Sequence, residues 1–135
     1  EDGEERGVMS FNRFKRGKGR TVRRVPGTMN KTEQSYAKVL GERIAHGIIE
    51  HYGFESITLK LAPDTRWTPD FFVLMPDGEI QFHEVKGRNK KTGKPRIEDH
   101  SLVKIKVAAA MFPFRFIVVW PNGLGGWDSK EVDPV

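Results

Sequence analysis

The 135-residue sequence contains no cysteine, which excludes a disulfide framework and a zinc site with cysteine ligands. It has no apolar run of membrane-spanning length and no stretch that predicts a signal peptide. The four His residues lack metal-ligand spacing, and neither a Ser-His-Asp arrangement nor a phosphate-cradling glycine loop is visible. We therefore expect one cytoplasmic domain that needs no membrane and no organic cofactor.

The net charge of +5 is unevenly spread along the chain. Residues 10–31 hold eight Lys and Arg and residues 86–96 hold six more, whereas all 18 acidic residues lie elsewhere. Two basic segments attached to an acidic body favour local attraction to a polyanion. The composition of the first segment predicts a flexible arm, and that of the second predicts a mobile loop. We expect both segments to contact DNA. The alternative for each is a solvated segment without a role. The predicted contacts are Arg13, Lys15, Arg16, Lys18, Arg20, Arg23, Arg24, Arg88, Lys90, Lys91, Lys94 and Arg96.

Residues 68–86 are the most informative stretch of the chain. A short apolar run over residues 71–75, a turn at residues 76–78 and an extended segment over residues 79–86 predict an antiparallel hairpin. Because side chains alternate along a strand, Glu84 and Lys86 share one face, and Asp70 starts the partner strand beside them. The hairpin should therefore bring Asp70, Glu84 and Lys86 together.

This set of side chains suits phosphodiester hydrolysis. Asp70 and Glu84 supply the hard oxygen ligands that Mg²⁺ prefers, and Mn²⁺ is expected to substitute. The backbone carbonyl of Val85 lies between the two functional side chains and could bind the same ion. Lys86 could orient the attacking water or offset negative charge that develops on the phosphate. The alternative is a surface hairpin in which Glu84 and Lys86 only form an ion pair.

Pro69 and Asp70, followed by Glu84, Val85 and Lys86, resemble the motif of the PD-(D/E)XK nuclease superfamily, which has the restriction-endonuclease-like fold. Residues 30–120 look most like the phage endonuclease I type of Holliday-junction resolvase and related phage proteins. The resemblance implies a Mg²⁺-dependent deoxyribonuclease that acts as a dimer on branched DNA, in a bacterium or a phage-infected host cell. The chain departs from that pattern in a longer spacing between Asp70 and Glu84 and in the basic loop after Lys86.

Residues 30–51 predict the first helix, with Asn30 as its N-cap and Glu33 three positions on, as a capping box requires. On a helical wheel, Glu33 falls near the middle of an apolar stripe that includes Ile44 and Ile48. The resemblance implies that Glu33 is a further metal ligand and catalytic residue. A purely capping role is the alternative, since one side chain cannot serve both roles fully.

The remaining elements complete an α/β fold in the order αβββαβ, a mixed sheet flanked by helices with a restriction-endonuclease-like core. We expect a first strand over residues 54–61 after a helix stop at Gly53, a loop over residues 62–67, a second helix ending at Phe112, and a buried strand over residues 115–120 that pairs in parallel. Lys106 lies inside the apolar arc of the second helix, where it could assist the site or extend to solvent. The predicted organisation is a basic arm over residues 1–27, a nuclease core over 28–120, and a tail over 121–135 that packs on or extends from the core.

The sequence therefore predicts a metal-dependent DNA endonuclease. Two alternatives are a catalytically silent nucleic-acid-binding module of the same fold and a sequence-specific nicking or restriction-type nuclease.

Overall fold

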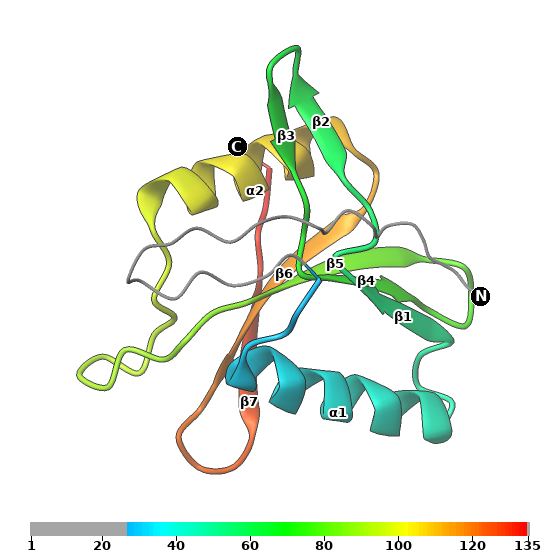
Figure 1. The fold of residues 1–135 in the computed structure, drawn as a ribbon, viewed down its shortest axis with the longest axis vertical. Coiled ribbons are helices and arrows are strands. Elements are labelled where there is room, and N and C mark those ends of the chain that lie inside the picture. The colour runs from blue at the N-terminus through cyan, green and yellow to red at the C-terminus, as the bar shows by residue number, and fades with distance from the viewer. Residues whose placement is uncertain (1–26, 135) are drawn as a thin grey trace.

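A computed structural model describes residues 27–134. It contains two helices and seven strands (Figure 1). In chain order these are α1 (Lys31–Ala45), β1 (His51–Phe54), β2 (Leu59–Ala62), β3 (Thr65–Trp67), β4 (Phe71–Leu74), β5 (Ile80–Val85), α2 (Asp99–Met111), β6 (Arg115–Pro121) and β7 (Trp127–Glu131). The expected α/β class with a mixed sheet and two helices is confirmed at this level. Neither of these helices combines the length and the apolar composition needed to cross a membrane.

The main sheet has five strands in the order β1-β4-β5-β6-β7. The β4–β5 hairpin is antiparallel, with Phe71 opposite His83, as the sequence predicts. Strand β5 also pairs with β6, and this pairing is parallel because α2 carries the chain back across the sheet. Strand β5 thus lies at the centre of the sheet, with one antiparallel and one parallel neighbour.

Each face of the sheet is covered by one helix (Figure 1). Ile105 and Ala108 of α2 are buried in one core with Phe82 of β5. Tyr36 and Leu40 of α1 are buried in the other, against a different set of side chains from the same sheet. Because neighbouring residues of a strand point to opposite faces, β5 supplies Phe82 to the first core and Val85 to the second. The core of this small domain is therefore divided between two thin layers.

Helix α1 is shorter than expected. Its predicted capping box is present at Asn30, but the helix ends at Ala45 and the chain turns at Gly47, whose φ of +72° suits glycine. Ile44 and Ile48, which the sequence placed on the apolar stripe, are exposed, and Ile49 is the buried residue instead. The early turn rotates the chain so that only the first three turns of the helix face the core.

The predicted strand over residues 54–61 is wrong because the chain bends at Glu55, whose φ is +49°. Gly53, which we expected to stop the helix, instead lies in β1 opposite Phe72 of β4. A Cβ at Gly53 would come within 2.6 Å of the Ser56 hydroxyl, so a larger residue there would have to displace the Ser56 side chain. After the bend, β2 leaves the main sheet and pairs with β3, in a segment that we expected to be a loop.

A final strand, β7, was not predicted. It pairs antiparallel with β6, and Arg115 binds Glu131 across the pair, with 2.7 Å between Nη2 and Oε1. Strand β7 is exposed along most of its length, so its sequence lacks the apolar alternation that reveals a half-buried strand. The observed order of elements is therefore longer than the predicted αβββαβ order.

Candidate active site

The site forms where β4 begins and β5 ends. The register of the hairpin places Asp70 opposite Glu84, on the same face of the sheet. The Asp70 amide donates a hydrogen bond to Glu84 Oε1 at 3.0 Å, and the Val85 amide donates one to Asp70 Oδ2 at 2.8 Å. Each strand therefore holds the carboxylate of the other, and the two side chains are fixed as a pair.

The carbonyl of Val85 lies just beyond the last pair of the β4–β5 ladder, Phe71 opposite His83. The Lys86 amide donates to the Val119 carbonyl of β6, so the polar backbone groups of Val85 point the other way, toward β4. There the register continues to Pro69, which has no N–H to donate. A proline at this position thus leaves the Val85 carbonyl available beside the two carboxylates.

Lys86 lies on the same face as Glu84, as the alternation predicts. Its Nζ atom is 3.7 Å from Glu84 Oε2, and both side chains are largely shielded from water, with exposed fractions of 18% and 13%. The ammonium therefore lies close to both carboxyl groups and opposes the rise of their pKa values.

Glu33 makes the expected capping contact and also lies near the carboxylate pair. Its Oε1 accepts a hydrogen bond from the Asn30 amide at 2.9 Å, which completes the capping box. Its side chain is nevertheless buried, and its negative charge helps to raise the pKa of both Asp70 and Glu84. The first turn of α1 therefore brings a third carboxylate close to the pair.

Burial raises the pKa of Asp70 to about 8, and the neighbouring Glu84 charge adds to this effect. Burial likewise raises the pKa of Glu84, against the opposing effects of the Asp70 amide and the Lys86 charge. A bound divalent cation would reverse this repulsion, because it supplies positive charge where two carboxylates meet.

The residues present fit Mg²⁺ in one particular way. Across residues 27–134, no three or more His, Cys, Asp and Glu side chains are grouped so that they could hold a metal ion. Mg²⁺ is commonly held by one or two carboxylates while it keeps several waters, and it does not need an all-protein cage. The donor set that fits here is therefore Asp70, Glu84 and the Val85 carbonyl, with Glu33 acting through its charge.

The basic segment after Lys86 is a hydrogen-bonded hairpin, where we expected a mobile loop. Arg88 and Pro95 form a bridge, and the Trp120 indole donates a hydrogen bond to the Gly93 carbonyl at 3.0 Å. Most of its cationic side chains are exposed, namely Lys90, Lys91, Lys94 and Arg96. These charges therefore belong to a hydrogen-bonded segment that starts at the end of β5 and leads to α2 (Figure 1).

The other predicted contacts are not all placed at the site. Arg13, Lys15, Arg16, Lys18, Arg20, Arg23 and Arg24 lie outside the described residues. The inward position predicted for Lys106 is wrong, because its side chain is exposed. The buried side of α2 is centred on Ile105 and Ala108, which leaves Lys106 on the solvent side and Lys104 half-buried at the edge.

A polar cluster on the opposite face of β5 was not predicted. His83 Nδ1 is 2.6 Å from the Tyr36 hydroxyl, and its Nε2 is 2.9 Å from Gln81 Oε1. Burial lowers the pKa of His83 to about 4, with help from the charges of Arg43 and Arg115. The imidazole is therefore neutral at physiological pH: it donates from Nε2 to Gln81 and accepts from Tyr36, whose own pKa burial raises to about 12. This cluster ties α1 to the sheet and faces away from the carboxylates.

Comparison with known proteins gives no relative for this chain: no family model, no curated protein and no solved structure matches it.

Proposed function

We propose that the protein is a metal-dependent endonuclease that hydrolyses phosphodiester bonds in DNA. The observation that supports this most directly is the reciprocal pairing of Asp70 and Glu84 at the adjacent ends of β4 and β5, with Lys86 beside them. A pair of buried carboxyl groups whose pKa values are raised marks a place where ionisation costs stability unless a cation offsets the charge. Such a place is expected at a site that binds a cation and is rare in a purely structural hairpin.

In this proposal Asp70, Glu84 and the Val85 carbonyl hold Mg²⁺, or Mn²⁺ in its place. The bound ion would activate a water and polarise the phosphate. Lys86 lies where its ammonium can orient that water or stabilise charge on the phosphate. Glu33 adds negative charge to the cation site while its hydrogen bond to Asn30 keeps the start of α1 in place.

The finer fold assignment belongs to the same proposal. A β4–β5 hairpin followed by α2 and a parallel β6 agrees with the restriction-endonuclease-like core that the sequence motif implies. Branched DNA as the substrate and a homodimer as the active form rest on the resemblance of the motif to Holliday-junction resolvases. The basic hairpin adds a phosphate-binding surface beside the site.

The test is incubation with linear duplex, single-stranded and four-way-junction DNA, with Mg²⁺ or with EDTA. Wild-type protein should cut in Mg²⁺ and not in EDTA, and Asp70→Asn should bind DNA without cutting it. Asp77→Asn is the matched control, because Asp77 is exposed in the turn at the other end of the same hairpin. If wild-type protein cuts no form of DNA or RNA with either metal, or if Asp70→Asn cuts normally, the nuclease proposal fails.

One observation favours a second candidate, a catalytically silent nucleic-acid-binding module. Asp70 and Glu84 already accept hydrogen bonds from backbone amides, which gives them partial compensation without a metal. This candidate predicts salt-dependent DNA binding that neither EDTA nor Asp70→Asn abolishes, and no cleavage under any condition.

A further inference from the structure

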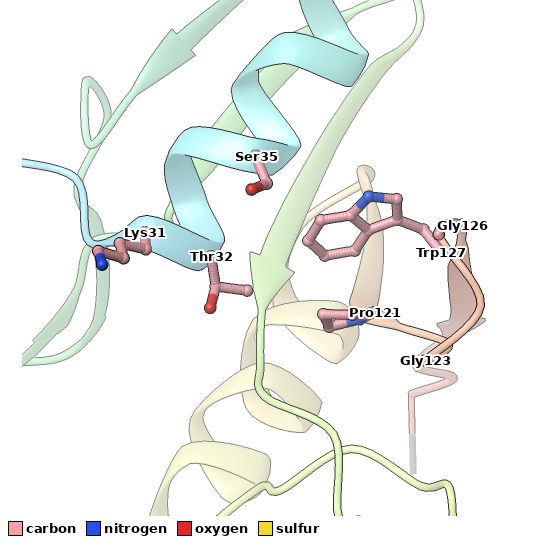
Figure 2. Close-up of a pocket in the computed structure, with 8 residues that line it drawn as sticks. Lys31, Thr32, Ser35, Pro121, Gly123, Gly126 and Trp127 are labelled. Carbon is pink, nitrogen blue, oxygen red and sulfur yellow. The ribbon is translucent and has the colours of Figure 1, made fainter.

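A hollow of about 330 Å³ lies between the first turn of α1 and the turn that joins β6 to β7. Figure 2 shows the Trp127 indole and the Pro121 ring on one side, and Thr32 and Ser35 on the other. Its size is at the lower end of the range of roughly 300–1,000 Å³ that is typical of small-ligand pockets. The hollow therefore has room for one flat ring system with its polar substituents.

The hollow opens beside the candidate active site. Pro121 ends the strand that pairs with the end of β5, and the Lys86 amide donates to the Val119 carbonyl two residues earlier in that strand. On the opposite wall, Thr32 adjoins Glu33, whose charge acts on the carboxylate pair. The hollow and the carboxylate site thus share the first turn of α1 and the adjacent ends of β5 and β6.

The lining combines an aromatic platform with positive charge. Tyr36 packs against Trp127 with 4.9 Å between ring centroids and so fixes the indole in place. The Arg88 guanidinium supplies this charge at the edge of the hollow, where a Cβ at Gly123 would come within 3.0 Å of Cζ. Lys31 lines the helix side, with its ammonium directed away from the indole (Figure 2). The residues that line it are Lys31, Thr32, Ser35, Pro121, Gly123, Gly125, Gly126 and Trp127, and this set contains no acidic side chain.

We propose that this hollow binds one unpaired nucleobase of the strand that is cut, and this proposal rests on the nuclease function proposed above. An aromatic face flanked by cations is the combination that binds single-stranded nucleic acid, because the base stacks on the ring while the cations attract the phosphates. Thr32 and Ser35 line the side of the hollow that lies across from the indole.

A base inside a duplex is stacked on both faces, so it can enter the hollow only after it leaves its pair. The enzyme therefore selects DNA in which a base next to the scissile phosphate is already unpaired, as at a branch point, a bulge or a frayed end. Specificity of this kind comes from local DNA structure and requires no sequence-reading domain.

The test uses DNA that carries the fluorescent base 2-aminopurine, either unpaired or fully paired, in EDTA so that no cutting occurs. Wild-type protein should change the fluorescence of the unpaired base and should bind that DNA about tenfold or more tightly than the paired form. Ser35→Phe, on the exposed side of the first turns of α1, fills the hollow and should abolish both effects. Gln34→Phe places the same ring on the neighbouring exposed position outside the hollow and should retain them.

The proposal is overturned if the wild-type protein leaves the fluorescence unchanged, or if Ser35→Phe still distinguishes the two DNAs while its melting temperature is that of Gln34→Phe. Cleavage of the same DNAs in Mg²⁺ is read separately. If cleavage is absent while the fluorescence effect is present, the nuclease function fails and the nucleobase site stands. If the two DNAs are cut equally and no fluorescence effect is seen, the nuclease function stands and the nucleobase site fails.

Discussion

Replacing Asp70 with Asn should stabilise the metal-free protein, and the gain should grow with pH. The pKa of Asp70 is raised from 3.8 in the unfolded chain to about 8 in the native protein by burial and by the Glu84 charge. Between these values the native state keeps a proton that the unfolded state releases, so the free energy of unfolding falls as the pH rises. Asn cannot ionise, so the free energy of unfolding of the variant does not fall with pH for this reason.

The size of the effect follows from the width of that interval. At about 1.4 kcal/mol per pH unit, the rise from pH 3.8 to pH 7 corresponds to a loss of about 4 kcal/mol in the wild-type protein. For a domain of this size the melting temperature of the variant should exceed that of the wild-type protein by on the order of 15 °C at pH 7. The two proteins should differ least near pH 4.

Thermal unfolding in EDTA across pH 4–8, followed by circular dichroism, measures this difference. His83 acts in the opposite direction, because its lowered pKa of about 4 makes the native state more stable as the pH rises toward 6.5. It is present in both proteins, so the difference between the two curves reports on Asp70 together with its neighbour Glu84. Asp77→Asn, which removes an exposed carboxylate from the same hairpin, should follow the wild-type curve.

The reasoning is refuted if the difference between Asp70→Asn and the wild-type protein stays constant between pH 4 and pH 8. Mg²⁺ should also restore the stability of the wild-type protein at pH 8. The gain should be about 2.7 kcal/mol when the free Mg²⁺ concentration is a hundred times its dissociation constant. The same addition should leave Asp70→Asn unchanged.

Four further changes test other parts of the structure. Lys86→Met should lower turnover on the order of 100-fold while calorimetry shows Mg²⁺ binding intact. Glu33→Gln should keep the helix cap and the melting temperature but reduce cleavage; near-normal cleavage would leave only the capping role. Tyr36→Phe removes a donor from buried His83, so it should cost roughly 1–3 kcal/mol in urea unfolding without changing turnover. Deletion of residues 1–24, which lie outside the described residues, should flatten the salt dependence of DNA affinity, and an unchanged slope would remove them from the binding surface.

The sequence predicts those parts of the fold that depend on local patterns. The alternation of side chains along two strands that flank a turn predicts the β4–β5 hairpin. The same alternation places Glu84 and Lys86 on one face. The capping box at Asn30 is equally local. Each of these features depends only on residues that are close together in the sequence, which is why they could be predicted.

The features that could not be predicted depend on distant partners or on backbone strain. The bend at Glu55 divides an apparently continuous strand, although Glu is not a residue that favours positive φ. Strand β7 is recognised only through its pairing with β6. His83 meets Tyr36 across 47 positions of the chain, and the residues of the hollow come from opposite ends of the described segment.

At the site itself, the motif predicts the residue types but not their hydrogen bonds. The sequence indicates that Asp70 and Glu84 come together, since both lie at the same end of a hairpin. It contains no signal that each carboxylate accepts a hydrogen bond from the backbone of the opposite strand. Pro69 has no N–H to offer the Val85 carbonyl, and the Val85 amide takes the side chain of Asp70 as its acceptor.

The two amides at Asp70 and Val85 consequently report on the chemistry of the site. Each N–H donates a hydrogen bond to a carboxylate oxygen, so its proton resonance shifts downfield when that oxygen carries charge. The resonance moves back upfield when a proton or a metal ion binds the carboxylate. A ¹⁵N-labelled sample therefore has two amide signals, one from each strand, that report ionisation and cation binding without any reaction taking place. Because the same hydrogen bonds join the two strands, a change of charge at the site also changes the strength of the strand pairing at this end of the hairpin.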